Sequence, residues 1–159
     1  MPNPVSGWSD SRYWSFIRSA LRSAWSKYPN KFKALEKAKS KAQGVGRRKY
    51  DYTCACCTKK YAAQDVSVDH IIPCGSLRSW SDLEHFASRL FCDVEGLQVL
   101  CKWCHDKKTL EDRGINPELN SFKKLTAQAQ LKKLRKLGLE EGSNQVKRLE
   151  IYERWLNGN

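Results

Sequence analysis

Two Cys-x-x-Cys pairs constrain this chain of 159 residues more than any other feature of its sequence. Cys54 and Cys57 form the first pair, Cys101 and Cys104 form the second, and the 43 residues between them mean that only the fold can unite the pairs. Thiolates at i and i+3 on a turn point toward one position, and four thiolates suit a closed tetrahedral zinc site. Buried free thiols are the alternative interpretation. We therefore predict a structural Zn²⁺ that contributes folding energy to a small core.

The remaining cysteines bring the total to seven, an odd number. Together with the metal-type spacing, this is typical of a reducing compartment and not of a secreted disulfide scaffold. Cys56 offers a competing Cys-x-Cys spacing with Cys54, but we favour Cys57 because the longer spacing leaves room for backbone N–H groups to face the sulfurs. Free thiols are expected at Cys56, Cys74 and Cys92.

The chain carries no apolar run of about 18 residues, so no membrane-spanning helix is predicted. Its first ten residues lack the basic and then apolar pattern of a signal peptide: MPNPVSGWSD. The mean hydropathy of -0.68 indicates a very polar surface around the core. These features predict a cytoplasmic protein.

The net charge of +12 is segregated along the sequence. Residues 1–49 carry a net charge of +10, residues 50–115 carry -2, and residues 116–159 carry +4. We therefore predict a basic helical N-terminal arm over 1–49, a core over 50–115 and basic C-terminal helices over 116–159. Basic flanks around an acidic centre favour a polyanion such as duplex DNA over a merely solubilising surface.

Hydrophobic periodicity predicts an α+β fold that is mostly helical, with short strands around the cysteine pairs. The aromatic side chains of the first helix are expected to pack against the core and not to stack on bases: Trp14, Phe16 and Trp25. The expected helices run from Ser9 or Asp10 to about Ser26, from Asn30 to about Gln43, from Ser81 with a capping box to Glu84, from Asn116-Pro117 to Gly138 or Gly142, and from Ser143 onward.

Lysines crowd the second of these helices and continue into a basic hinge. A helix with so much positive charge is a candidate to lie along DNA phosphates, although a polar surface helix is the alternative. The candidate DNA-binding residues are Lys31, Lys33, Lys37, Lys41, Arg47, Arg48, Lys107 and Lys108.

Two of the three histidines lie beside other candidate ligands. His70 follows Asp69 at the end of a predicted strand, and His105 follows Cys104 directly, so the zinc would set the position of His105. An Asp-His pair with a second histidine suits an open site that combines a hard metal ion and a general base. A bend or bulge is needed to turn Asp69 and His70 toward one site. His85 lacks such neighbours and is expected to be structural.

Residues 50–110 resemble the HNH endonucleases, which have a ββα-metal fold, and in particular their small phage-encoded members. The resemblance rests on the Cys54/Cys57 pair and on three further segments, Val68–Pro73, Gly96–His105 and Lys108-Thr109. It implies a ββα-metal core with a zinc site of four cysteines, flanked here by basic helices.

The resemblance also implies an activity and its residues. His70 would be the general base that activates water, and Asp69 and His105 would hold one catalytic divalent cation, Mg²⁺ or Mn²⁺. The products would be a 5′-phosphate and a 3′-hydroxyl, and Lys107 or Lys108 would add charge near the phosphate. A monomer or weak dimer, working in the host cytoplasm on duplex DNA with or without other phage proteins, would nick one strand per active site.

One residue departs from the family pattern. HNH endonucleases usually carry an asparagine before Leu-Gln, where it holds the loop that bears the base, and this chain has Gly96. A backbone carbonyl, Glu95 or Gln98 takes over that role, or catalysis is weakened. The competing hypotheses are therefore a zinc-stabilised DNA-binding module without catalysis and an interaction protein that binds no nucleic acid.

Overall fold

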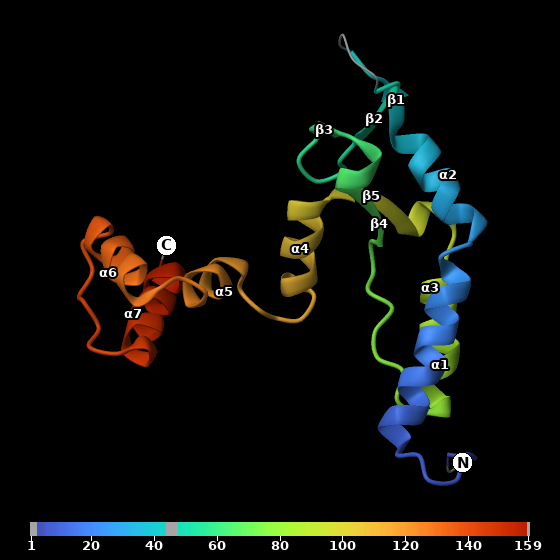
Figure 1. Ribbon diagram of the computed structural model, residues 1–159, viewed down its shortest axis with the longest axis horizontal. Helices are drawn as coiled ribbons and strands as arrows, with labels where there is room; N and C mark the ends of the chain where they lie inside the picture. The colour runs from blue at the N-terminus through green and yellow to red at the C-terminus, as the bar shows by residue number, and fades with distance from the viewer. Residues whose placement is uncertain (1–2, 44–47, 159) are drawn as a thin grey trace. The chain divides into compact units, whose positions relative to one another are not determined.

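A computed structural model describes residues 3–43 and 48–158 of the chain (Figure 1). The described residues contain seven α-helices and five short strands, which is an α+β fold. The chain forms two compact units, residues 1–105 and residues 106–159. The basic N-terminal segment and the cysteine pairs lie in the first of these units. None of the described helices is both long and apolar enough to cross a membrane.

The first unit opens with two helices, α1 and α2, and a three-stranded antiparallel sheet in the order β1-β2-β3. Ser9 caps α1 as predicted, because its side chain accepts the N–H of Arg12. The second helix is shorter than predicted, since Pro29 starts it and the chain turns extended at Lys39 to pair with β2. The bounds are α1 Asp10–Trp25, α2 Pro29–Ala38, β1 Lys39–Lys41, β2 Tyr50–Thr53 and β3 Lys60–Tyr61.

A second sheet of two antiparallel strands, β4 Val66–His70 and β5 Leu97–Cys101, is the centre of the first unit. Its register is regular from Val66 opposite Cys101 to His70 opposite Leu97. Between the two strands lies α3, Leu83–Leu90, and directly after β5 begins α4, Lys102–Glu111. A 3-10 turn precedes α3, and its capping box joins Ser79 to Asp82, where Ser81 and Glu84 were expected.

Two apolar clusters hold the first unit together. One lies between α1 and α3, which run side by side in Figure 1, and contains Tyr13, Trp14, Cys74, Leu77, Phe86 and Leu90. The other packs α2 on the β4–β5 sheet through Ala34, Val68, Leu97 and Val99. Tyr13 and Trp14 are thus core residues as predicted, whereas Phe16 and Phe32 are 58% and 52% exposed and face water.

The second unit contains the C-terminal part of α4 and three further helices among the described residues, with bounds α5 Pro117–Lys123, α6 Ala127–Lys136 and α7 Gln145–Gly158. The single Lys-rich helix expected from Asn116 is therefore two helices, because Thr126 caps a new one by accepting the N–H of Ala129. Phe122, Leu134 and Tyr152 make the buried core, and the rings of Phe122 and Tyr152 stack at 4.2 Å.

Candidate metal centre and neighbouring acid–histidine site

The four paired cysteines come together in the first unit. The Sγ atoms of Cys54, Cys57, Cys101 and Cys104 all lie within 4.8 Å of one another, and three of these residues are buried. Four sulfurs at about 2.3 Å from one zinc ion would be about 3.8 Å apart. The measured separation of 4.0 Å between the Sγ atoms of Cys57 and Cys101 is close to that value. The donor set and its spacing thus fit a zinc ion, as the sequence predicted.

Local backbone geometry brings the first pair into position. Cys54 follows β2, and the chain turns back so that the N–H of Thr58 donates to the Cys54 carbonyl at 2.9 Å. Thr58 takes the left-handed conformation, with φ of 59°, which closes this knuckle before β3. The N–H of Cys101 donates to the Cys54 sulfur at 3.3 Å and so ties the knuckle to the end of β5. Cys56 lies on the same turn but is exposed and outside the four-sulfur group.

Two of the four thiols differ strongly in acidity. The Tyr61 hydroxyl, 3.4 Å from Cys57 Sγ, is the main cause that lowers the pKa of Cys57 to about 6. Burial raises the pKa of Cys104 well above its usual range. The lowered pKa of Cys57 favours its thiolate, which is the form that a metal ion binds, whereas Cys104 would ionise only when a bound cation balances its charge. The sequence alone did not identify Tyr61 as a neighbour of the cluster.

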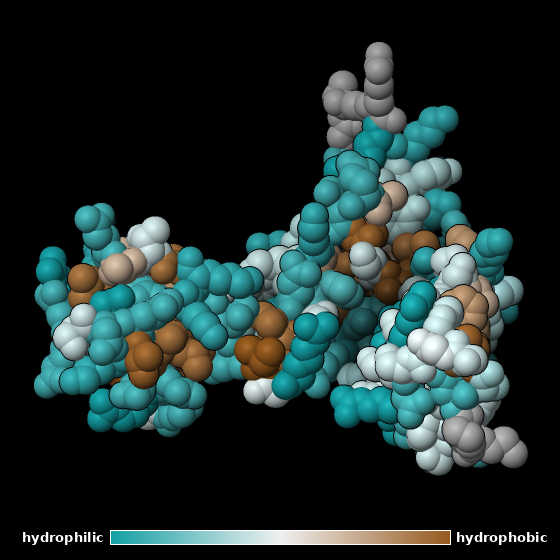
Figure 2. All heavy atoms as spheres, turned by 60° about the horizontal axis from the view of Figure 1, so that its bottom comes forward, coloured by the Kyte–Doolittle hydropathy of each residue, from teal (hydrophilic) through white to brown (hydrophobic). Residues whose placement is uncertain are grey.

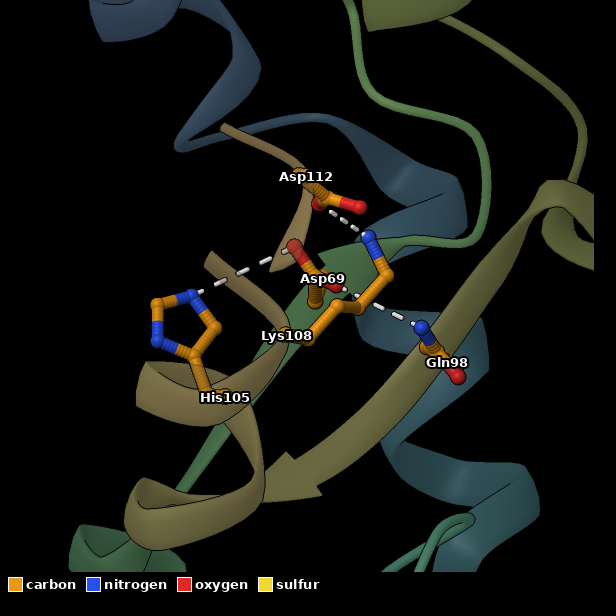
Figure 3. A network of polar contacts seen from close by, with 5 residues as sticks. All are labelled: Asp69, Gln98, His105, Lys108 and Asp112. Carbon is orange, nitrogen blue, oxygen red and sulfur yellow. Dashed lines mark hydrogen bonds and ion pairs between the residues drawn. The ribbon is translucent and has the colours of Figure 1, made fainter. Parts of the chain in front are cut away.

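Asp69 and His105 meet on one side of the β4–β5 sheet (Figure 3). Nε2 of His105 lies 4.0 Å from Oδ1 of Asp69, and the Gln98 amide, opposite Asp69 on β5, donates to Asp69 Oδ2 at 3.4 Å. A separation of 4.0 Å is too long for a hydrogen bond. Neighbouring ligands of an octahedral Mg²⁺ ion would be about 3 Å apart, so the two side chains would have to approach by about 1 Å to hold one ion together with water ligands. Within the described residues, only the cysteines form a larger group of potential ligands.

His70 lies elsewhere. No bulge interrupts β4, so Asp69 and His70 point to opposite faces of the strand. The His70 ring is buried against the indole of Trp25, with ring centroids 5.0 Å apart, and its Nε2 is 3.0 Å from the Leu90 carbonyl. The bend that would turn both side chains toward one site is therefore absent, since the sheet register continues to the last residue of β4.

The free nitrogen of His70 remains chemically useful. A carbonyl accepts, so Nε2 carries the proton and Nδ1 is the unprotonated nitrogen. Within the described residues no hydrogen bond to Nδ1 is found, and the residue as a whole is buried, with 9% of its surface exposed. Trp25 and the Leu90 carbonyl, which set this orientation, could not be identified from sequence because they are distant along the chain.

Because Gly96 has no side chain, its backbone can lie closer to Cys92 than any other residue would allow. A Cβ at this position would lie 2.8 Å from Sγ and 3.2 Å from Cβ of Cys92. The Gly96 carbonyl accepts the N–H of Ile71, directly after His70, at 2.9 Å. The Gly96 carbonyl therefore tethers the loop that follows His70, while the neighbouring Glu95 pairs with Lys37 at 3.0 Å.

Replacing Gly96 by alanine is expected to destabilise the first unit by about 1–3 kcal/mol, because the added methyl group collides with Cys92. Cys92→Ala should cost little by itself and should recover part of the loss in the double variant, since it removes the nearer atom of the clash. Urea unfolding of the four proteins measures this coupling. Strictly additive free energies of unfolding would show that the contact does not control this position.

Four of the eight predicted DNA-binding residues form ion pairs with carboxylates in the described part of the chain. Arg48 bonds the buried Asp51 at 2.7 Å, Lys107 lies 3.8 Å from Glu111, and Lys108 lies 2.5 Å from Asp112 (Figure 3). Lys37 pairs with Glu95, and Lys31 lies over the Trp25 ring at 4.8 Å. Arg47 lies outside the described residues. Among the candidates that are described, exposed lysines with no ion pair remain at Lys33 and Lys41.

These pairs differ in how readily a phosphate could replace the carboxylate. Both side chains of the Lys37–Glu95 pair are exposed, at 63% and 74%, so the pair contributes little to stability. Lys37 can therefore exchange Glu95 for a phosphate. The Arg48–Asp51 pair cannot, because removing Arg48 would leave a buried carboxylate uncompensated. Arg48 is thus a structural residue, and the predicted phosphate contacts concentrate on α2 and β1.

Comparisons of the chain with protein-family models, curated proteins and solved structures found no match.

Proposed function

We propose that this chain is a metal-dependent endonuclease of the HNH type that hydrolyses phosphodiester bonds in duplex DNA. The observation that carries the proposal is the placement of Asp69 on β4 at 4.0 Å from His105 on α4, the helix that begins directly after the partner strand β5. A cysteine cluster at the junction of β5 and α4 supports this arrangement, because Cys101 and Cys104 flank the turn that leads to His105.

Asp69 and His105 would hold one divalent cation, Mg²⁺ or Mn²⁺. When bound there, the ion would supply charge to neutralise the scissile phosphate and the departing 3′ oxygen. Gln98 donates to one carboxylate oxygen of Asp69 and so leaves the other oriented toward His105. Lys33, Lys37 and the other basic residues of α2 would hold the DNA backbone by charge.

His70 is the proposed general base. Its Nε2–H is engaged by the Leu90 carbonyl, so Nδ1 would accept the proton of the attacking water. Because Asp69 and His70 lie on opposite faces of β4, a phosphodiester can reach both only past the end of that strand, where His70 is the last residue. The loop beyond it is tethered through Ile71 to Gly96, which limits how far this end can move.

Supercoiled plasmid tests the proposal directly. Wild-type protein with Mg²⁺ or Mn²⁺ should convert it to relaxed circles, and excess EDTA should stop the reaction. His70→Ala and His70→Gln should nick at least about 100-fold more slowly, whereas exchange of the exposed His85 for alanine should leave the rate unchanged. A melting curve for each variant separates lost chemistry from lost folding. Equal rates for the His70 and His85 variants would exclude His70 as the base.

A second candidate function is a zinc-stabilised DNA-binding module without catalysis. The specific observation in its favour is that His70 faces away from Asp69 and packs on Trp25, as a structural histidine would. This hypothesis predicts salt-sensitive DNA binding with no nicking in any divalent metal. If the protein showed no affinity for DNA, and hence no decline in affinity between low and moderate salt, both DNA hypotheses would fail.

A further inference from the structure

The start of α1 carries an aromatic and arginine group that the proposed function does not use. The guanidinium of Arg12 lies over the Trp8 ring at 4.4 Å from its centroid, and the Phe16 ring meets Trp8 edge-on at 5.7 Å. Phe16 is 58% exposed, although it stands among aromatic residues that mostly enter the core. We call Trp8, Arg12 and Phe16 the α1 shelf.

The α1 shelf borders an open hollow of about 540 Å³ on the surface of α1. Serine hydroxyls form the rest of its lining, and Figure 2 shows this part of the molecule as a pale area of intermediate hydropathy at lower right. Ser9 uses its hydroxyl to cap α1, and Ser19 donates to the Ser15 carbonyl. Ser11 and Ser15 have no side-chain hydrogen bond within the described residues, so their hydroxyls can bind a polar ligand.

The surroundings of the α1 shelf are positively charged. A second hollow of about 500 Å³ shares Ser11 with the first and is lined by Arg18 and Arg78, with Asp10 as its one acid among the described residues. Arg18 donates to the Leu77 carbonyl at 3.4 Å and is thereby held at this surface. The α1 shelf itself offers an exposed ring, serine hydroxyls and the guanidinium of Arg12, while Arg18 and Arg78 lie in the adjoining hollow on another face of α1. These groups fit a ligand that has flat apolar faces and negative charge.

We infer that the α1 shelf binds an unpaired nucleotide, so that its ligand class is single-stranded DNA. Proteins hold single strands by stacking bases on aromatic side chains beside cationic groups. In a duplex the base faces are stacked on one another and cannot stack on a side chain. Its phosphates alone would not bind an exposed phenylalanine ring. The positive charge and the hydroxyl lining disfavour an apolar peptide as the occupant. This site is distinct from Asp69 and His105, and its function does not require that the chain cleaves DNA.

Fluorescence anisotropy with a labelled single strand of about 12 nucleotides, and with a duplex of equal length, tests the inference. Phe16→Ala should weaken single-strand binding about tenfold and leave duplex binding unchanged, and Phe16→Trp should retain single-strand binding. Lys33→Ala is the matched control, because it removes charge from α2 and should weaken both ligands alike. Because Phe16 is exposed, Phe16→Ala should have the same melting temperature as the wild type.

The outcomes separate this inference from the proposed nuclease. Equal affinities of wild type and Phe16→Ala for the single strand, or equal losses for both ligands, would overturn the site, whatever the plasmid assay shows. A selective loss of single-strand affinity in a protein that never nicks plasmid would support the site and reject the nuclease. Binding of neither ligand at low salt would overturn the site as well.

Discussion

Exchange of Cys101 for serine should abolish zinc binding and unfold the first unit. Cys101 is 3% exposed and joins β5 to α4, and its backbone N–H already contacts the Cys54 sulfur. The free energy of binding a structural zinc ion is also folding free energy, so its loss is expected to cost at least about 5 kcal/mol. In a unit of this size the melting temperature should fall by about 20 °C or more. Native mass spectrometry and calorimetry measure the two losses together.

The matched control is Cys56→Ser, which makes the same chemical change on the exposed face of the first knuckle. It should retain one zinc ion per chain and melt within about 2 °C of the wild type. Cys57→Ser should lose zinc and stability as Cys101→Ser does. Comparing it with Cys56→Ser decides whether the first pair is Cys54 with Cys57 or Cys54 with Cys56. Matching melting curves for wild type and Cys101→Ser would contradict a structural role for the cluster.

Exchange of Asp69 for alanine should leave the fold intact and remove nicking activity. Its side chain is 20% exposed, and loss of the long hydrogen bond of 3.4 Å from Gln98 is expected to cost about 1 kcal/mol. A catalytic cation contributes several kcal/mol to the transition state, which corresponds to a rate loss of about 1,000-fold. The relaxation rate of supercoiled plasmid gives the activity, and urea unfolding gives the stability.

Two further variants make this result specific. His105→Ala should lose activity to the same extent, because it removes the other proposed ligand. Gln98→Ala should slow the reaction only several-fold, since it removes a group that orients Asp69 and not a ligand. Calorimetric titration with Mn²⁺ should show weaker binding by both ligand variants. Full nicking activity of Asp69→Ala, with unchanged Mn²⁺ affinity, would rule out the proposed cation site.

The sequence predicted the zinc-type cluster because the geometry within each cysteine pair is local, although only the fold brings the two pairs together. A Cys-x-x-Cys pair on a turn converges on one point wherever it occurs, and four such sulfurs have few stable arrangements other than around a metal ion. The helices α1, α3 and α7 were likewise expected from periodicity and caps. Errors arose where a competing local feature intervened, as when Thr126 started a new helix and Lys39 paired with β2.

The surroundings of His70 could not be predicted in this way. Its neighbours, Trp25 and the Leu90 carbonyl, are far away along the chain, and only packing of α1 and α3 around the sheet brings them to the ring. The contact between Gly96 and Cys92 likewise depends on backbone approach, which residue type alone does not reveal. The same holds for Lys37 on α2, whose partner Glu95 is 58 residues away along the chain, whereas Lys108 on α4 pairs with Asp112 only four residues on.

By itself, the sequence determined that four thiols would meet, that an acid and a histidine would flank them, and that positive charge would dominate the N-terminal segment. The tertiary structure alone decided that His105 faces Asp69 while His70 faces Trp25, and that Phe16 stays in water. The physical reason is that strand alternation and helix packing, set by contacts distant in sequence, choose the face on which each side chain lies.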